Sequence, residues 1–583
     1  MMTRVNSMPD HNRSNETRLA LMLTAVAFAT TAGCAFASPD GLHHFDDLSH
    51  YLYARWAWTW PGYLLDHWGR PGFTVLYFPT AALGWTACRI LSGLLSAATG
   101  WFAFRIARRM NLRHAWAAVP LVWLQPLYFV LLQTTLTETP LAFYLALAVL
   151  LASRGRWGWS SAVLSAAFVT RHEAILFLPI WLFFAYRAQV SWIRLWPMIW
   201  APAVVNVAAY FSGMTTIIEL YLRPKPSNQY GSDGWLTFFA RSLHAWGPAV
   251  SAMTWAGALG VAGALLLPKL RRFSLTPPIG DSPATHQTGA VESATGVMAD
   301  VRPRSSLDPR DSALLVIACL VAYFAAQTVI RVFGLFDSGG YARFLVPVGP
   351  MAAIMALAAW NGLTTHQFDT RRFFACLTGG AMLLLWASLE LQMRYHHGID
   401  IEFPMLKQAL IAMRIATPTL MLLAAISAIE FTRPLDFVAA RVLPAGLVLM
   451  LGLTAFIFIR PLQPPPEAPI VAEAFEALRS KGLGDREIIS AVVWLDYVQN
   501  RQRDPREPST RERIEQAPIG TLFAWDKQFA GSPDHKLQLE EFTQSPAFRH
   551  VLSTRPKSYA TEPYLRIFEK IGPWGPDSAS ETP

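Results

Sequence analysis

The sequence has 583 residues, of which 53% are hydrophobic and only 15% are charged. Soluble domains carry about a quarter charged residues, so most of this chain is excluded from the soluble globular class. The net charge of +9 arises largely from basic residues in short loops between apolar runs, which is typical of the cytoplasmic side of a membrane protein. We therefore expect a polytopic membrane protein with no nucleic-acid partner.

The chain begins with a polar, basic stretch followed by an apolar run at 19–37. The run ends on Ala35, Phe36 and Ala37, which resemble the cleavage site of a signal peptide. Its length exceeds the roughly 7–15 residues of a typical signal-peptide core, so the sequence favours an uncleaved first helix. Either interpretation places the next residues, an outer loop at about 38–72, outside the cytoplasm.

Apolar runs recur through the rest of the first 459 residues, and most approach the roughly 20 residues that cross a bilayer. Alternating them from a cytoplasmic N-terminus predicts about thirteen transmembrane helices and places the C-terminus outside. A stretch at 268–311 is rich in Pro, Ser, Thr and Gly and predicts a flexible cytoplasmic linker. The predicted spans include 115–132, 246–267, 312–332, 344–361, 372–392, 408–430 and 441–459.

One apolar stretch, at 160–186, is interrupted by Arg171, His172 and Glu173. Charged residues are expensive in hydrocarbon, and arginines of the cytoplasmic type flank both ends of the stretch. Two short helices that meet at the outer face satisfy both facts better than one continuous span.

The composition changes at Arg460, which is followed by a Pro-rich segment. The sequence therefore divides into a transmembrane domain at 1–459 and a soluble domain at 460–583, which is long enough for a small fold. Helical periodicity at 471–478 and strand character at 488–495 and 521–525 predict an α/β fold outside the cytoplasm.

The predicted topology gathers several polar residues at the outer face. They are Asp46, Asp47, Glu138, Arg171, His172, Glu173, Tyr341 and Arg343. Such a cluster suits the transfer of a sugar from a lipid phosphate, because a carboxylate can remove the acceptor's proton and arginines bind phosphate well. A surface site also fits spans with few ionisable residues near the bilayer midplane, where transporters usually bind their substrates.

Each of these residues also has a purely structural interpretation. Adjacent aspartates are often helix caps or solvated loop residues, and Glu138 suits a helix N-terminus because of the helix dipole. Arg171 and Glu173 can form a structural ion pair at the helix break. Arg343 can be an interfacial anchor, although the neighbouring Gly339-Gly340 indicates a close approach of the backbone to another group. The nearby histidines match no metal-binding motif, so the sequence indicates neither a metal nor a cofactor, while a divalent ion is compatible with it.

Four motifs, in this order, resemble the GT-C superfamily of polytopic glycosyltransferases, and in particular the bacterial relatives of the protein O-mannosyltransferases and the aminoarabinose lipid A transferase. They are Asp46-Asp47 with Tyr51; Gly69-Arg70-Pro71-Gly72 leading to Gly84 and Arg89; Thr134 to Glu138 with Thr170-Arg171-His172-Glu173; and Gly339-Gly340-Tyr341-Ala342-Arg343. The likeness covers most of 19–360. It departs from the family in having Asp-Asp where Asp-Glu is commonest, and His172 where many relatives have proline.

The resemblance implies a membrane glycosyltransferase that moves a sugar from a polyprenyl-phosphate donor to a glycan, lipid or protein acceptor. It implies that Asp46 is the catalytic base of an inverting reaction, assisted by Asp47. Arg171 and Arg343 would bind the donor phosphate. The positioning residues would be Glu138, Glu173, His172, Tyr341 and Tyr51.

We expect the protein in the plasma (inner) membrane, among membrane lipids, with its active site and C-terminal domain outside the cytoplasm. Two other interpretations stay open. One is a transporter or flippase of lipid-linked sugars, which would share the phosphate-binding arginines, and the other is a catalytically silent assembly subunit.

Overall fold

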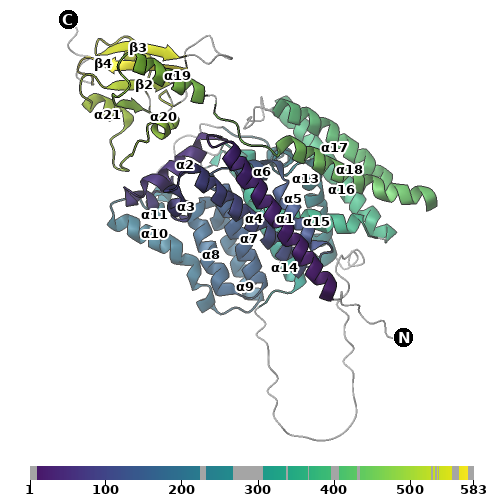
Figure 1. Cartoon of the computed structure of the whole chain (residues 1–583). Coiled ribbons are helices and arrows are strands. Elements are labelled where there is room, and N and C mark those ends of the chain that lie inside the picture. The colour runs from purple at the N-terminus through teal and green to yellow at the C-terminus, as the bar shows by residue number, and fades with distance from the viewer. Residues whose placement is uncertain are drawn as a thin grey trace, which may run out of the picture. The chain divides into compact units, whose positions relative to one another are not determined.

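Helices dominate the computed structural model, and eight of those it describes are long and apolar enough to cross a membrane. It describes residues 10–222, 231–266, 306–335, 339–365, 367–395, 406–429, 433–465, 467–526, 529–531, 535, 537–554 and 564–575. The eight are α1 (Asp10–Ala37), α4 (Trp85–Arg109), α13 (Pro248–Leu266), α14 (Pro309–Val332), the continuous pair η8 (Ala342–Val348) and α15 (Gly349–Leu363), α16 (Phe368–Tyr395), α17 (Leu406–Ala428) and α18 (Arg433–Phe458). The prediction of a polytopic membrane protein is confirmed (Figure 1).

The predicted count of about thirteen spans exceeds these eight because several predicted segments fold as shorter helices. The predicted span at 115–132 is divided into η2 (Ala115–Ala117), α5 (Ala118–Trp123) and α6 (Pro126–Leu131). Pro126 disfavours the helical conformation for the residue before it, and Gln125 is accordingly extended, with φ −68° and ψ 130°. The expectation of one continuous helix there is wrong.

The predicted break in 160–186 is confirmed. Helix α8 (Trp157–Thr170) ends at Arg171, a short 3₁₀ helix η3 (His172–Leu176) follows, and α9 (Phe177–Arg187) continues from it. Most of the predicted linker at 268–311 lies outside the described residues. Helix α14 begins at Pro309, so the last three residues of the predicted linker are helical instead; the side chain of Asp308 caps this helix by accepting the amide N–H of Asp311 at 2.7 Å.

The residues that contact one another most densely form two units. One, here called the membrane unit, comprises Met1–Phe36, Arg70–Phe73 and Arg89–Arg460. The other, here called the C-terminal unit, comprises Ala37–Gly69, Thr74–Cys88 and Pro461–Pro583. The first predicted outer loop therefore packs largely with residues that follow Arg460.

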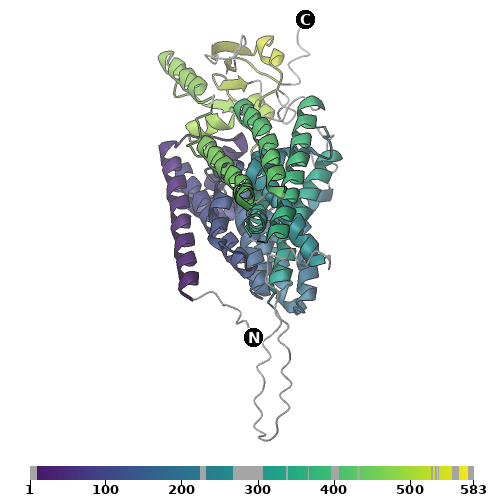
Figure 2. The same ribbon diagram turned by 90° about the vertical axis from the view of Figure 1, so that its right-hand side faces the viewer.

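Helices in the membrane unit approach one another through small residues, as is usual where lipid surrounds them. A Cβ on Gly257 of α13 would lie 1.9 Å from the carbonyl oxygen of Met355 on α15. Thr254 on the same face donates its hydroxyl to the carbonyl of Ala352 at 3.0 Å. Among the long helices that follow, α16 packs against α13, α17 against α16, and α18 against α17 (Figure 2).

The remaining helices of the membrane unit are short. They are α7 (Glu138–Ser153), η4 (Trp192–Arg194), η5 (Trp196–Ile199), α10 (Trp200–Phe211), α11 (Ile217–Leu222) and α12 (Thr237–Trp246). Helix α3 (Pro71–Ala81) begins in the membrane unit and continues into the C-terminal unit.

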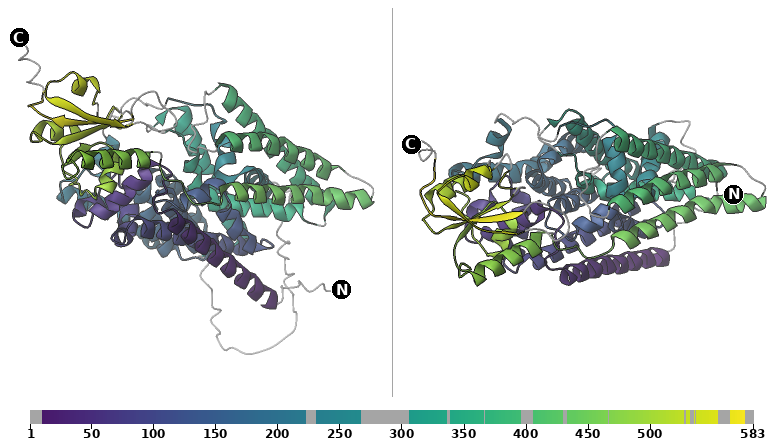
Figure 3. Two further views of the ribbon diagram at one scale, coloured as in Figure 1. Left: turned by 45° about the horizontal axis from the view of Figure 1, so that its top comes forward. Right: turned by 90° about the horizontal axis from the view of Figure 1, so that it is seen from above.

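The C-terminal unit contains a small β-sheet, whose arrows are largely yellow in Figure 3. The sheet has four strands in the order β1-β2-β4-β3. Its strands are β1 (Ile488–Ser490), β2 (Leu522–Asp526), β3 (Phe548–Thr554) and β4 (Leu565–Lys570), and its helices are α2 (Phe45–Trp56), η1 (Pro61–Leu64), α19 (Glu467–Ser480), α20 (Val493–Val498), α21 (Thr510–Gln516) and α22 (Glu540–Thr543). Strand β1 pairs parallel to β2, while the other pairs are antiparallel. The predicted α/β fold is confirmed, and a strand lies near 521 as expected. The predicted strand at 488–495 is wrong in its second half, because β1 ends at Ser490 and α20 begins at Val493.

An aromatic core fills one face of this sheet. Phe523 and Phe568 lie on paired strands and contact Phe542 of α22, with ring centroids 4.6 and 5.8 Å away. Trp525 is buried and donates its indole N–H to the carbonyl of Leu537 at 2.9 Å. Because buried aromatic groups contribute most of the apolar area of small cores, these side chains stabilise the sheet.

Candidate active site

Two predicted site residues stand at helix ends of the membrane unit. Glu138 is the first residue of α7, where the helix dipole favours a negative charge. Arg171 leaves the helical conformation at the end of α8, with φ −147° and ψ 134°. Both are buried, their side chains being 2% and 9% exposed.

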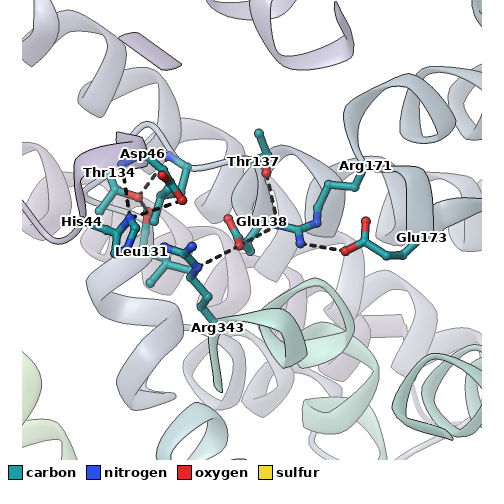
Figure 4. Close-up of polar contacts among 10 residues, drawn as sticks. His44, Asp46, Leu131, Thr134, Thr137, Glu138, Arg171, Glu173 and Arg343 are labelled. Atoms are coloured by element: carbon teal, nitrogen blue, oxygen red, sulfur yellow. Dashed lines mark hydrogen bonds and ion pairs between the residues drawn. The ribbon is translucent and has the colours of Figure 1, made fainter. Parts of the chain in front are cut away.

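The structure brings Arg171 between the two predicted glutamates (Figure 4). Its Nη1 donates to Glu138 Oε1 at 2.6 Å, and its Nη2 donates to Glu173 Oε1 at 2.8 Å. The same Nη1 donates to the hydroxyl of Thr137 at 3.2 Å. The structural ion pair considered from the sequence is therefore present, and it extends to a second carboxylate.

Arg343 joins this network from η8. Its Nε lies 3.6 Å from Glu138 Oε1, so one carboxylate oxygen faces two guanidinium groups. Tyr341 and Phe344 cover the guanidinium of Arg343 at 4.9 and 5.8 Å from its carbon to the ring centroids. Phe344 also lies 4.9 Å below Arg171. The network holds two positive and two negative charges, which sum to zero.

The glutamate and the arginine at the centre of this network each have a buried polar atom with no hydrogen bond within the described residues. These atoms are Oε2 of Glu138 and Nε of Arg171. An unsatisfied buried donor or acceptor costs about 1–3 kcal/mol, so each atom is a place where a bound molecule would gain a hydrogen bond. One accepts and the other donates, which fits a ligand with both a hydroxyl and an anionic oxygen.

Glu173 is held in its charged form. Burial alone would raise the pKa of this carboxyl, but the charge and hydrogen bond of Arg171, with help from Arg70, outweigh burial and lower the pKa to about 2. Arg70 was not among the predicted site residues. It adopts φ 60° just before α3, and such strain in a non-glycine residue costs about 1–3 kcal/mol and often marks a functional site.

The acidic pair Asp46-Asp47 lies in the C-terminal unit, in the first turn of α2 rather than in an irregular loop. His44 is the N-cap residue, and its Nδ1 accepts the amide N–H of Asp46 at 3.2 Å (Figure 4). The side chain of Asp46 is 35% exposed, whereas Asp47 is fully buried. The two aspartates therefore lie at a helix N-terminus, as the structural interpretation expected. Their catalytic role stays a prediction.

The other predicted positioning residues divide between the units in the same way. Tyr51 is buried in α2, and its hydroxyl accepts a hydrogen bond from Arg55 at 3.2 Å. His172 opens η3 between Arg171 and Glu173, and Tyr341 precedes η8. The structure therefore brings the predicted arginines and glutamates together in the membrane unit. That the aspartates share a site with them stays a prediction.

A second charged cluster in the membrane unit was missed from the sequence. Asp233 Oδ2 accepts hydrogen bonds from Arg331 Nε at 2.6 Å and Arg241 Nη2 at 3.2 Å. Gly340 adopts φ 64°, and a Cβ there would lie 2.6 Å from Arg241 Nη1. The close backbone approach inferred from Gly339-Gly340 is confirmed. The available signal was an arginine in each of two apolar helices, Arg241 in the middle of α12 and Arg331 in the last turn of α14. The sequence does not show that these two helices bring the arginines together.

The described residues contain no group of three His, Cys, Asp or Glu side chains arranged to hold a metal ion. The network offers anionic and cationic contacts instead, so its chemistry is that of binding a charged or hydroxyl-bearing group.

Two crystal structures of ArnT from Cupriavidus metallidurans are similar to the fold of this chain over 95% of the present chain and 99% of ArnT. The apo structure gives a TM-score of 0.51 at 13% identity, and the structure bound to undecaprenyl phosphate gives 0.52 at 14%. The chain has the fold of ArnT. ArnT is a GT-C enzyme, the aminoarabinose lipid A transferase, so the predicted GT-C-like fold of a multi-pass membrane protein is confirmed. Neither a family model nor a curated protein sequence matches the chain.

Proposed function

We propose that this protein is an integral membrane glycosyltransferase that moves a sugar from a polyprenyl-phosphate donor to a glycan, lipid or protein acceptor. The observation that carries the proposal is the pair of unpartnered buried atoms, Arg171 Nε and Glu138 Oε2, in a chain with the ArnT fold. A sugar phosphate supplies a phosphate oxygen for the guanidinium and a hydroxyl for the carboxylate. The undecaprenyl phosphate bound to ArnT supports a lipid phosphate of this class as the donor carrier.

The proposed roles follow from burial and charge. Arg343 and Arg171 bind the donor phosphate, because guanidinium groups match phosphate oxygens in geometry and charge. Glu138 and Glu173 fix the arginines, and Glu138 Oε2 accepts a sugar hydroxyl. His172, Tyr341 and Tyr51 position the neighbouring groups.

Asp46 is the proposed general base. Its carboxylate takes the proton of the acceptor hydroxyl or amine while the acceptor atom bonds to the anomeric carbon. The bond from that carbon to the phosphate oxygen breaks, and polyprenyl phosphate leaves with the electron pair, so the anomeric configuration inverts. Partial exposure of Asp46 allows an acceptor to reach it, while the buried Asp47 assists from within the same helix. We place this reaction at the extracytoplasmic face of the plasma (inner) membrane.

The test is transfer of labelled sugar from polyprenyl-phosphate donors by the purified protein in lipid vesicles. We expect Asp46→Asn to lower turnover by about 10²–10⁴-fold, the usual contribution of a general base, while donor binding is retained. Asp485→Asn is the matched control, because Asp485 is an exposed aspartate of the same unit. Full activity of both Asp46→Asn and Asp47→Asn would refute the base assignment.

The same vesicles separate the enzyme from its alternatives. Glu138→Gln is expected to weaken donor binding, since the amide cannot replace the carboxylate between two arginines. Donor that crosses the vesicle membrane with no transfer to any acceptor would favour a transporter or flippase. Neither transfer nor crossing, with donor still bound, would favour a silent assembly subunit.

A further inference from the structure

An arginine cluster in the C-terminal unit begins where α20 ends. Asn500 adopts the left-handed conformation, with φ 53°, directly after the helix. The amide of Arg501 then donates to the carbonyl of Asp496 at 2.9 Å, and that of Asn500 donates to Tyr497 at 3.1 Å. This is the hydrogen-bond pattern of a Schellman motif, and it turns the chain back so that the loop after α20 carries its arginines toward Asp496.

Three guanidinium groups gather here around two carboxylates. Arg503 Nη2 lies 2.6 Å from Asp496 Oδ2, and Asp496 is fully buried. Arg501 Nη2 and Arg513 Nη1 each lie 3.5 Å from an oxygen of Glu507. Glu507 thus brings two guanidinium groups to a single carboxylate.

Each arginine keeps one buried nitrogen that makes no hydrogen bond to any described residue. These are Nη1 of Arg501, Nε of Arg503 and Nη2 of Arg513. The three side chains are only 15%, 21% and 9% exposed. Three unsatisfied donors on neighbouring arginines are costly, and a group with several acceptor oxygens is the kind of ligand that would satisfy them.

The charges of the cluster do not balance. Three guanidinium groups face the carboxylates of Asp496 and Glu507, which leaves one positive charge in excess. A further carboxylate, Glu487, lies 3.7 Å from Arg501 but is 65% exposed, so water screens its attraction. Burial, and after it the repulsion of Arg501, lowers the pKa of Arg513 to about 10. A bound anion would relieve this repulsion.

Aromatic side chains of the same unit form the surroundings of the cluster. Trp56 donates its indole N–H to the carbonyl of Arg501 at 2.6 Å. Tyr63 packs against Trp56 with ring centroids 5.5 Å apart, and Tyr53 packs against Tyr63 at 4.8 Å. Arg503 is close enough to both phenols to interact with them electrostatically. Apolar walls strengthen the interaction of a bound anion with the arginines, because they lower the local dielectric constant.

We propose that the cluster of Arg501, Arg503 and Arg513 is a binding site for a phosphate group. Phosphate presents three strong acceptor oxygens, which matches three separate N–H donors better than the two oxygens of a carboxylate. The binding is independent of the proposed glycosyltransferase activity. Its use to recruit a phosphate-bearing acceptor rests on that proposed function.

The test is isothermal titration of the full-length protein in detergent with sodium phosphate and glycerol phosphate at constant ionic strength. We expect saturable binding of both, and much weaker binding of acetate. Arg501→Gln and Arg513→Gln should each raise the Kd for phosphate at least tenfold. Arg549→Gln is the control, since Arg549 is 65% exposed and forms an ion pair with Glu569 on the neighbouring strand β4.

Arg513→Lys keeps the charge and tests the same point if Arg513→Gln fails to fold; it should raise the Kd by less than Arg513→Gln. The proposal would be overturned if the wild-type protein showed no saturable binding of phosphate, or bound phosphate no more tightly than it binds chloride. Equal Kd values for the wild type and both glutamine variants would also overturn it, because a purely structural cluster predicts that result.

The source of the phosphate group is resolved by two further measurements. Binding to nanodiscs that contain phosphatidic acid, lost in Arg513→Gln, identifies a lipid headgroup, whereas binding confined to glycerol phosphate identifies a water-borne group. In the transfer assay, Arg513→Gln should raise the KM for a phosphorylated acceptor and leave kcat unchanged. Phosphate binding without any sugar transfer would refute the proposed function and leave this site standing.

Discussion

Replacing Glu138 by glutamine removes the negative charge that lies between two buried guanidinium groups. Its Oε1 is 2.6 Å from Arg171 and 3.6 Å from Arg343, and the substitution changes the charge of the network from zero to +1. Breaking a buried ion pair by removing one partner costs about 3–5 kcal/mol. Glutamine keeps the shape and one acceptor oxygen, so we expect the lower end, about 3 kcal/mol, or roughly 10²-fold in the ratio of folded to unfolded protein.

The measurement is denaturant unfolding of the purified protein in detergent, followed by tryptophan fluorescence. Arg343→Gln and the double variant Glu138→Gln/Arg343→Gln complete a double-mutant cycle, in which we expect a coupling energy of about 0.5–3 kcal/mol. The double variant should lose less stability than the two single losses added, because it leaves no excess charge.

The matched control is Glu541→Gln. Glu541 pairs with Arg511 at 2.8 Å, but both side chains are about a third exposed, and exposed pairs contribute only about 0.2–1 kcal/mol. A loss of stability for Glu138→Gln no larger than that for Glu541→Gln would refute the view that the network is buried and charge-balanced.

Three further predictions concern other parts of the chain. Gly340→Ala should lower the free energy of unfolding by more than the roughly 1–2 kcal/mol that a left-handed alanine costs, because the new Cβ would also lie 2.6 Å from Arg241. Gly213→Ala is the control, since Gly213 has φ 67° and open space around it and should show the backbone cost alone. Equal losses of unfolding free energy in the two variants would contradict the clash with Arg241. The folded-state pKa of Glu173 lies below its ordinary value of 4.5, so its ion pair stabilises fully above about pH 4.5 and is lost as pH falls toward 2; Glu173→Gln should flatten the stability profile over that window, and an unchanged slope would exclude this linkage. Asn500→Gly should leave stability within a few tenths of a kcal/mol, while Asn500→Ala should cost about 1–2 kcal/mol and weaken phosphate binding; identical melting curves for both would contradict the left-handed turn.

The sequence predicted the membrane helices, the helix break at Arg171 and the α/β character of the C-terminal residues because these depend on local hydropathy and on the cost of charge in hydrocarbon. It could not predict that Arg171 bonds to Glu138, since the pairing of residues 33 positions apart depends on how α7 and α8 pack. Strand β3 escaped prediction for a related reason. Its alternation is irregular, with two consecutive exposed residues and a register shift between His550 and Leu552.

The network around Glu138 and the cluster around Arg513 differ in net charge, and this difference determines which ligands each can bind. Arg171 already donates both of its Nη groups to glutamates, so the network around Glu138 can add a ligand only through its remaining Nε, through Arg343 and through Oε2 of Glu138. Such a neutral network selects a ligand that brings both a donor and an acceptor, as a sugar phosphate does. The cluster around Arg513 has an excess positive charge and offers donors alone, so it selects an anion regardless of what the anion is attached to. If the proposed functions hold, the first cluster therefore discriminates between donors and the second only recruits, and substitutions in the first should change which sugar is transferred while those in the second change only how much acceptor is needed.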